Sequence, residues 1–289
     1  MSYHIKKGEP LAIAFGRIAE EEIDLAMSQL DRENRGEGIH NSRKALKRLR
    51  ALLRALRVAF PRRFRAENRH IGDAGRKISP LRDVHVQLRA LHDLGSRNGA
   101  GLRTRELLLR RQAEIGRQTP ALRKAVKKML RKSSRNIATW PLDKATPRDL
   151  ARSLSRIYKQ GRDAFKEACK KPSPELLHEL RKKAKLLGYG FELIEHLGPP
   201  KTAKTIKRVE GMSDALGDDH DLFMVGAALA SDKLSRQAAD YGELNKRICA
   251  RRRKLQRRAF KMGRVIYGEK PGRFKKELDL CLKELDKKG

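Results

Sequence analysis

The sequence carries the same short basic pattern twice, at positions separated by 138 residues. The pattern His-x-x-Arg-Lys-x-x-Lys begins at His40 and begins again at His178. The same shift, applied without a gap, also aligns Pro61 with Pro199 and gives seven identities across 44 positions. A single leucine match arises easily by chance, whereas a repeated basic pattern followed at the same distance by a helix-breaking proline does not. The repeat therefore predicts a fold built from two related halves.

Each half consists of long helical segments separated by glycine and proline. Leu, Ala, Lys, Arg and Glu dominate and alternating β-branched runs are absent, which favours an all-α fold. The periodic segments predict helices at 11–30, 39–60, 64–94 with a kink at 79–80, 102–133, 148–169, 173–197, 202–231 and 236–267, and a short helix after 271–272. We expect one domain over 10–285, with tandem, pseudo-symmetric four-helix halves at 10–135 and 147–285. The linker between them ends at Thr146, a predicted N-cap, and Pro147, at the first helical position.

The charge balance of the chain indicates the class of its partner. There are 69 Lys and Arg residues against 35 Asp and Glu, which gives a formal net charge of +34. A charge this large predicts a polyanionic partner: nucleic acid, an anionic membrane surface or a phosphate polymer. Aromatic residues make up only 5% of the chain. This scarcity counts against readers of single-stranded nucleic acid, which stack bases on aromatic rings.

Cysteine usage and hydropathy predict the compartment. The chain has three cysteines, far apart and without zinc-ligand spacing, which indicates a reducing, cytoplasmic environment. The first residues show no apolar stretch of signal-peptide length. The longest uncharged apolar run, 222–230, is too short to cross a bilayer. We therefore expect a soluble cytoplasmic protein with no membrane span.

The first basic pattern continues as a stripe along one face of its helix. Residues three and four positions apart share a helix face, and these steps join His40, Arg43, Lys47, Arg50 and Arg54, with Lys44 beside them. A leucine seam lies on the opposite side, at Leu46, Leu49, Leu53 and Leu56. No acidic residue occurs from 41 to 58. Like charges at this spacing destabilise an isolated helix by a few tenths of a kcal/mol per pair, so a bound polyanion is one explanation and a merely solvated face is the other.

The second stripe is shorter. It contains His178, Arg181, Lys182 and Lys185, backed by Leu180, Leu187, Phe191 and Ile194. Gly188 and Glu192 stand where the first half has Arg50 and Arg54, so we expect the halves to bind unequally. The histidine of each stripe lies near a helix start, where free N–H groups favour anions. We expect both histidines to donate to phosphate, with a core histidine as the alternative interpretation.

The acidic residues that recur are Asp83 and Asp221, and we expect them to orient nearby Arg or Lys side chains. The motif Asp218-Asp219-His220-Asp221 suggests a metal-dependent phosphohydrolase, but only its final Asp recurs in the first half. A metal site needs several converging ligands. Nucleophile-elbow, phosphate-loop, dinucleotide and zinc-protease motifs are absent from the sequence. We therefore expect no catalytic residues, no metal and no cofactor.

Two motifs resemble the conserved-histidine α-helical domain family, known as CHAD. The first is the basic pattern from His40 followed by Leu81-Arg82-Asp83, and the second is the pattern from His178 followed by His220-Asp221. The resemblance covers nearly the whole chain. It implies two four-helix bundles around a basic channel or groove, and binding of inorganic polyphosphate without catalysis. It also implies association with polyphosphate granules. The chain departs from the family at Ser79-Pro80, where Leu-Gly is frequent.

The predicted function is therefore non-catalytic polyphosphate binding through basic helix faces. The predicted polyphosphate-binding residues are His40, Arg43, Lys44, Lys47, Arg50, Arg54, Arg82, His178, Arg181, Lys182, Lys185, Lys207 and Arg208. Non-specific binding of a nucleic-acid backbone is the alternative, because a basic helix face attracts any chain of phosphates. Polyphosphate hydrolysis is the third interpretation. Competition between duplex DNA and polyphosphate, and phosphate release in the presence of Mg²⁺, distinguish the three.

Overall fold

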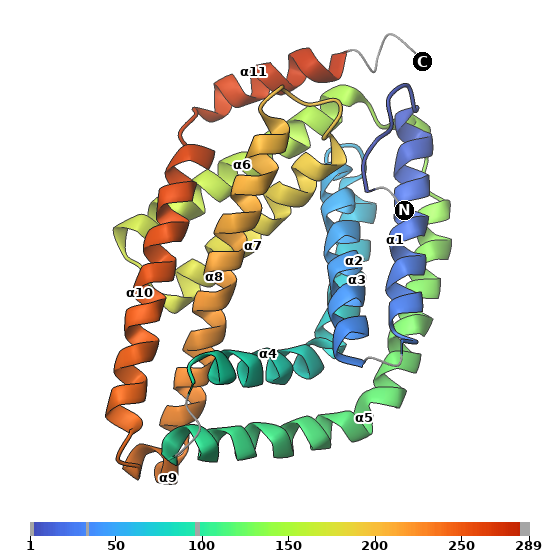
Figure 1. The fold of residues 1–289 in the computed structure, drawn as a ribbon. Coiled ribbons are helices and arrows are strands. Elements are labelled where there is room, and N and C mark those ends of the chain that lie inside the picture. Colours follow the sequence, from blue (N-terminus) through green and yellow to red (C-terminus); the bar gives the residue numbers. More distant parts are fainter. Residues whose placement is uncertain (1–2, 33–34, 96–98, 284–289) are drawn as a thin grey trace.

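The structure, a computed structural model, describes residues 3–32, 35–95 and 99–283, and the regular secondary structure in these ranges is helical. No strand occurs within these ranges, which confirms the all-α prediction. Figure 1 shows these helices, coloured along the chain from α1 to α11. The predicted domain end at residue 285 lies outside the described residues.

The described residues of the first half form five helices. They are α1 (Leu11–Gln29), α2 (Arg35–Ala55), α3 (Pro61–Lys77), α4 (Ser79–Asp93) and α5 (Gly99–Ala138). A short 3₁₀ turn, η1 (Leu142–Lys144), occupies the predicted linker. The second half contains α6 (Pro147–Lys170), α7 (Pro174–Leu193), α8 (Thr202–Ser231), α9 (Lys233–Gln237), α10 (Tyr241–Ile266) and α11 (Pro271–Leu282). Shifted by 138 residues, the bounds of α2 become 173–193, which differ by one residue from those of α7.

The halves differ where the sequence predicted a kink. The segment predicted as one helix over 64–94 is two helices, α3 and α4, with the break at Ile78. Pro80 lies in the first turn of α4. Proline lacks an N–H donor and its ring clashes with the preceding turn, so a new helix begins here. At the position equivalent to Pro80, the second half has Asp218, which continues the helix, and α8 is unbroken.

Side-chain caps fix the start of the second half. The Thr146 hydroxyl accepts a hydrogen bond from the Asp149 amide at 3.2 Å, and the Asp149 carboxylate accepts one from the Thr146 amide at 3.4 Å. This reciprocal pair satisfies two N–H groups that the helix leaves open. Ser173 caps α7 by accepting from the Leu176 amide at 3.3 Å. Both caps confirm the helix starts predicted from the sequence.

The hydrophobic seams of the basic helices are buried as predicted. Leu46, Leu49, Leu53 and Leu56 of the first half, and Leu180, Leu187, Phe191 and Ile194 of the second, are all buried. They belong to one large core that draws on α1, α2, α6, α7 and α8. A smaller core joins α4 and the first part of α5 to α8 and α10. Each core therefore combines residues from both halves of the sequence.

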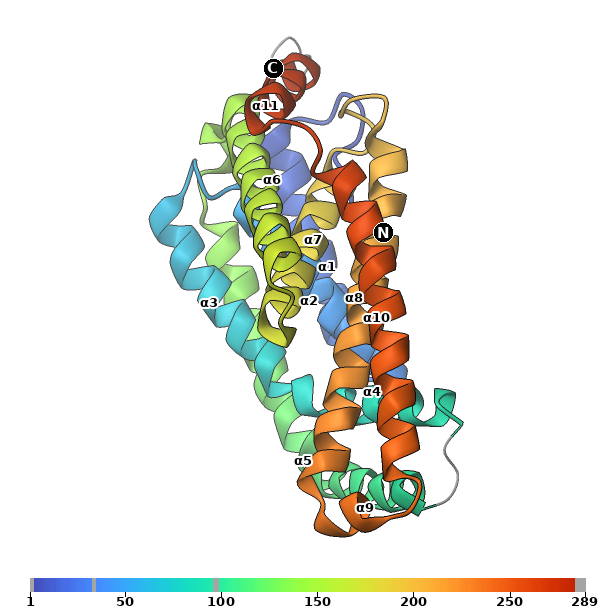
Figure 2. The same cartoon turned by 90° about the vertical axis from the view of Figure 1, so that its left-hand side faces the viewer.

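The two cores give the molecule its shape. In Figure 1, α4 and the first part of α5 cross the lower end of the molecule toward α8 and α9, while α11 covers the upper end. Figure 2 shows α8 and α10 running alongside each other, and these two helices pack together along their length. None of the described helices is long and apolar enough to cross a membrane.

Candidate anion-binding groove

The basic faces of α2 and α7 line two cavities of about 540 Å³ and about 400 Å³. The two cavities have a common wall. Among the described residues, those that line both are Arg43, Lys47, Arg181, Lys185 and Tyr189. We call these five residues the shared wall, and the wall with its two cavities the basic groove. The wall contains two cations from each half, so the repeat places its equivalent residues in a single site.

The two cavities differ in charge. The larger one is also lined by His178, by the acidic Glu179 and by further cations of both halves: Arg50, Arg54, Arg76, Lys182 and Lys183. The smaller one gains His40, Lys44 and Arg82, all from the first half. Its second-half side is acidic, with Glu192, Glu210 and Asp214. The smaller cavity therefore supports the expectation that the halves bind unequally, whereas the larger one has cations on both sides.

The structure brings most of the predicted binding residues together. Eleven of the thirteen line the basic groove, and the remaining two, Lys207 and Arg208, do not. The surface that α8 presents to the groove is formed by Val209, Glu210, Ser213 and Asp214. Arg208 instead lines a separate cavity beside Phe191. Lys207 and Arg208 are on α8, but neither side chain lines the groove.

Main-chain and neutral groups hold the arginines of the first half. The Arg43 guanidinium donates to the Gly75 carbonyl at 3.0 Å and to the Ser79 hydroxyl. The Nε of Arg50 donates to the Asn68 side-chain carbonyl at 3.0 Å. Neutral acceptors orient a guanidinium without cancelling its charge. These arginines therefore remain available to an anion.

The matching arginine of the second half is held by close packing. A Cβ atom at Gly217 would lie 3.2 Å from both Nε and Nη2 of Arg181, so the guanidinium lies directly against α8 where a side chain is missing. The 138-residue shift carries Ser79, the partner of Arg43, onto Gly217. Arg43 and Arg181 thus lie at equivalent places, one against a hydroxyl and one against a glycine. Their Nε atoms are buried and have no hydrogen-bond partner among the described residues.

Lys47 is the most strongly perturbed cation of the groove. Burial, followed by repulsion from Arg43 and Arg181, lowers the pKa of Lys47 to about 6. Burial and the charge of Arg181 also lower the pKa of Lys185. Burial, with a smaller contribution from Arg50, lowers the pKa of Arg54 to about 10. These cations destabilise one another, and a bound anion would relieve both their desolvation and their repulsion.

The histidines that begin the two basic patterns are not core residues. His40 is exposed and His178 is half-buried, and each lines one cavity of the groove. Burial, followed by repulsion from neighbouring cations, lowers the pKa of both. His178 lies beside His220, with ring centroids 4.5 Å apart, and burial together with His178 lowers the pKa of His220 to about 4. At neutral pH each imidazole is therefore uncharged and offers one N–H donor.

The recurring aspartates lie beside the groove arginines. Arg82 and Asp83 form an ion pair at 3.8 Å, and the charge of Asp83 favours the charged form of Arg43. Asp221 has the same effect on Arg181, while burial raises the pKa of Asp221 itself. Asp219 points away and accepts from Arg252 at 3.0 Å. Within the described ranges, the motif 218–221 does not bring together three potential metal ligands.

Sequence reasoning missed some residues of the site. Tyr189 belongs to the shared wall and follows Lys185 by four positions, so helical spacing alone would have placed it on the basic face. Arg76 and Lys183 also line the larger cavity. From the sequence, Glu192 is only the position where the second stripe lacks the counterpart of Arg54. Its carboxylate lies 2.8 Å from Arg48 of α2, so it joins the two basic helices.

Fold and groove together define an all-helical protein with a cationic site built from two sequence-related halves. The CHAD domain profile matches residues 17–230, and the chain belongs to this family. The crystal structure of the CHAD domain from the plant Ricinus communis is similar, with a TM-score of 0.58 and 17% sequence identity. That similarity covers 96% of this chain and 93% of the plant chain, and it concerns the fold. No curated protein matches the sequence.

Proposed function

We propose that this protein binds inorganic polyphosphate in the basic groove and does not hydrolyse it. The observation that carries the proposal is the shared wall, where two cations from α2 and two from α7 line both cavities. No acidic side chain among the described residues lines both cavities. Membership of the CHAD family supports polyphosphate as the ligand.

The form of the groove favours a thin, flexible polyanion. The shared wall connects its two cavities, so a ligand that contacts the wall extends into both. Its cations are half-buried, which favours a chain narrow enough to follow them inward. A polyphosphate chain carries a charge on every unit and has no bulky substituent. Duplex DNA presents its phosphates on a stiff rod and would meet mainly the exposed Lys44 and Lys182 at the edge.

Titration against competing polyanions tests the proposal. Purified protein is titrated with polyphosphate of defined lengths, and with duplex DNA at equal phosphate concentration, across a range of salt. With roughly six phosphate contacts at ~0.7 counterions each, a log–log slope of about −4 is expected, by analogy with single-stranded nucleic acid. We expect polyphosphate to displace DNA. Preferential binding of DNA would favour the nucleic-acid function, and a flat salt response would exclude the electrostatic mechanism.

The absence of catalysis is a separate part of the proposal. Hydrolysis of a phosphate chain generally requires metal ions held by converging carboxylates. Three carboxylates, Glu192, Glu210 and Asp214, line the smaller cavity, but among the described residues they do not come close enough together to form a three-ligand metal site. We expect no release of orthophosphate or shortening of the chain with Mg²⁺ or Mn²⁺ present. If orthophosphate is released, and the release is lost when Lys47 is substituted, the protein is an enzyme and the proposal of binding without catalysis is wrong.

The proposal extends to the architecture and the cellular context. We propose that the halves are tandem four-helix bundles related by a pseudo-two-fold axis and joined in one domain over 10–285. In this correspondence α3 and α4 together are the counterpart of α8, and α9 and α11 are additions to the second half. The equivalent bounds of α2 and α7, and the equivalent settings of Arg43 and Arg181, support the repeat. The large core common to both halves supports a single domain. We also propose a cytoplasmic protein that associates with polyphosphate granules, which fluorescence microscopy of the tagged chain in polyphosphate-replete and polyphosphate-depleted cells tests.

A further inference from the structure

The segment before α1 is held firmly against the core. Tyr3 and Ile5 are both buried. The Ile5 amide donates to the Leu193 carbonyl at 2.9 Å, and the Tyr3 hydroxyl donates to the Arg48 carbonyl at 2.8 Å. His4 lies between these two anchored residues. Its side chain therefore has a defined place on the surface beside the end of α7.

The chain that follows α7 is also well defined. Glu195 and His196 come directly after Ile194, whose carbonyl accepts hydrogen bonds from the amides of Leu197 at 2.9 Å and Gly198 at 2.7 Å. These bonds close a tight turn. The side chains of Glu195 and His196 are exposed on it, whereas Ile194 is buried. The turn presents two adjacent metal-ligating groups beside the anchored N-terminal segment.

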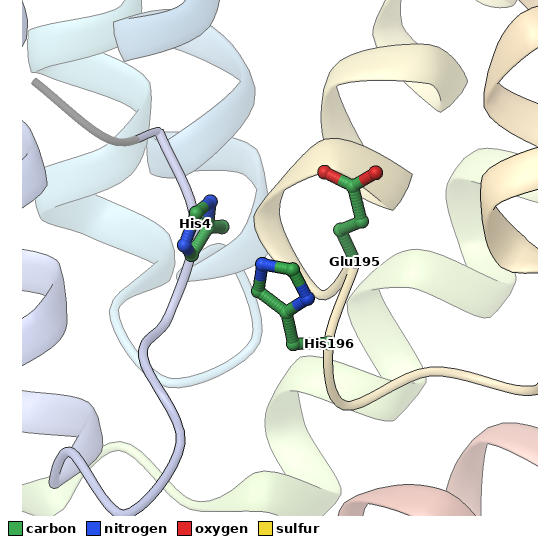
Figure 3. Close-up of side chains that lie close together, drawn as sticks. All are labelled: His4, Glu195 and His196. Atoms are coloured by element: carbon green, nitrogen blue, oxygen red, sulfur yellow. The ribbon is translucent and has the colours of Figure 1, made fainter.

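The two segments place three such groups together. One ligand atom from each of His4, Glu195 and His196 lies within 4.8 Å of the others. The two imidazole rings have their centroids 4.4 Å apart at an interplanar angle of 89°. Figure 3 shows the two rings standing at right angles to each other across the gap between the segments, with Glu195 next to His196. Among the described residues, these three form the group of histidine, cysteine and acidic side chains in which three possible ligand atoms lie this close together.

We propose that His4, His196 and Glu195 bind a divalent transition-metal ion of the zinc class. Two imidazole nitrogens and one carboxylate oxygen form a ligand set suited to Zn²⁺, and three protein ligands leave a position for water. Around tetrahedral zinc, ligand atoms at ~2.1 Å from the metal are about 3.4 Å apart. The present spacing exceeds this by little more than an ångström, which rotation of the exposed Glu195 and His196 side chains closes.

The charged groups around the three ligands suit a divalent cation. Glu195 supplies negative charge in a chain with a net charge of +34, which offsets the repulsion of a divalent cation. The His4 carbonyl accepts from Arg17 at 2.9 Å, and Arg17 itself is paired with Glu9. The charge of Arg17 is therefore partly offset by Glu9.

The site is distinct from the basic groove and has a different consequence. His4, Glu195 and His196 line neither cavity of the groove. A metal ion there would link the N-terminal segment to the turn between α7 and α8, two segments separated by most of the chain. Because the unfolded chain does not hold these ligands together, binding raises the free energy of unfolding.

Zinc binding by the full chain, without an added histidine tag, tests the inference. Metal-stripped protein is titrated with Zn²⁺ by calorimetry in the absence of polyphosphate, and the Tm is measured with and without the ion. The test variants are His4→Ala and His196→Ala. The matched control is His92→Ala, because the His92 side chain is 82% exposed and adjacent to an acidic residue but has no second histidine. Co²⁺ spectra report the ligand type, since thiolate ligation would implicate a cysteine instead.

We expect one equivalent of Zn²⁺ to bind wild type and the His92 variant, and to raise the Tm of both. Each test variant should lose at least about tenfold in affinity, because even changes that act indirectly on a metal site cost 10–100-fold. Polyphosphate affinity should stay unchanged in all variants, so failure of the metal site and failure of the proposed function are distinguishable. Equal zinc affinity in wild type and test variants, or no zinc binding at all, would overturn the proposal. The contact between His4 and His196 would then be only an edge-to-face packing of two rings.

Discussion

The Nη2 atom of Arg48 on α2 lies 2.8 Å from Oε2 of Glu192 on α7, so an ion pair joins the two basic helices. The same guanidinium lies 3.7 Å from Glu22 of α1. Glu22 is buried, and burial raises its pKa to about 7 despite the nearby Arg48. Arg48 therefore supports two carboxylates that are largely removed from water. It lines neither cavity of the basic groove, so its role is to hold the helices that form the groove.

Replacing Arg48 by methionine should destabilise the fold without weakening ligand binding. Loss of one partner of a buried ion pair costs about 3–5 kcal/mol, and the partial exposure of this pair reduces the expected loss to about 2–3 kcal/mol. Urea unfolding measures it. Lys44→Met, an exposed change on the same helix, is the control and should stay within about 0.5 kcal/mol of wild type. A change below that limit at Arg48 would show that the pair contributes nothing net.

Helical periodicity was sufficient to predict the local structure of this site. Steps of three and four residues placed the basic stripes opposite the leucine seams, and the seams are buried. Thr146 and Ser173 were recognisable caps because the capping atoms lie within three residues of each other. The repeat indicated that the two stripes are equivalent. The structure adds that both stripes line the same groove.

Contacts between distant segments were not predictable in the same way. Arg48 and Glu192 are separated by 144 positions, so the sequence showed only a missing cation at position 192. Lys207 and Arg208 were expected at the groove, but the rotation of α8 about its axis determines which of its faces lines the cavity. The meeting of His4 with His196 depends on the path of the N-terminal segment, which follows from no local periodicity. Tertiary packing alone decides these relationships.

The substitution Gly217→Ala should weaken polyphosphate binding through Arg181 without lowering the stability of the fold. Alanine is favoured over glycine inside a helix by about 0.5–1 kcal/mol. At position 217 its Cβ would press on the Arg181 guanidinium at 3.2 Å, so the arginine must move by a few tenths of an ångström. We expect wild-type stability or better with several-fold weaker polyphosphate binding. Gly226→Ala in the same helix, where the nearest atom is 3.8 Å away, should raise stability and leave binding unchanged.

Exposed lysines test whether the halves bind unequally. Lys44 and Lys182 are equivalent in the repeat and both are exposed, but they line different cavities. Lys182 forms an ion pair with Glu179, so part of its charge is already neutralised. Lys44→Glu should therefore weaken polyphosphate binding more than Lys182→Glu, with circular dichroism unchanged in both. Lys166→Glu, exposed on α6, controls for net charge. Equal losses from the two groove variants would indicate a symmetric site.

Lys47 should make both stability and binding depend on pH. Its pKa is about 6 in the folded protein against an ordinary value of 10.5, so between these values the unfolded chain binds more protons. The free energy of unfolding should therefore rise with pH across this window, and below pH 6 the full cost of a buried charge is present. Lys47→Met removes this cost. At pH 7 it should raise stability by about 1–2 kcal/mol, in line with apolar replacement of buried charges, and flatten the dependence on pH.

Binding should show the opposite preference, because a polyanion favours the charged lysine. Polyphosphate bound at pH 7–8 should restore the proton of Lys47, so affinity falls as pH rises, by up to tenfold per unit for each proton taken up. Calorimetry in buffers of different ionisation enthalpy counts these protons. Above pH 7 the imidazoles of His40, His178 and His220 are neutral in the free protein. The variant Lys185→Met separates the proton uptake of Lys185, whose pKa is also lowered by burial, from that of Lys47. If Lys47→Met keeps wild-type proton uptake and affinity, the groove does not engage phosphate through this side chain.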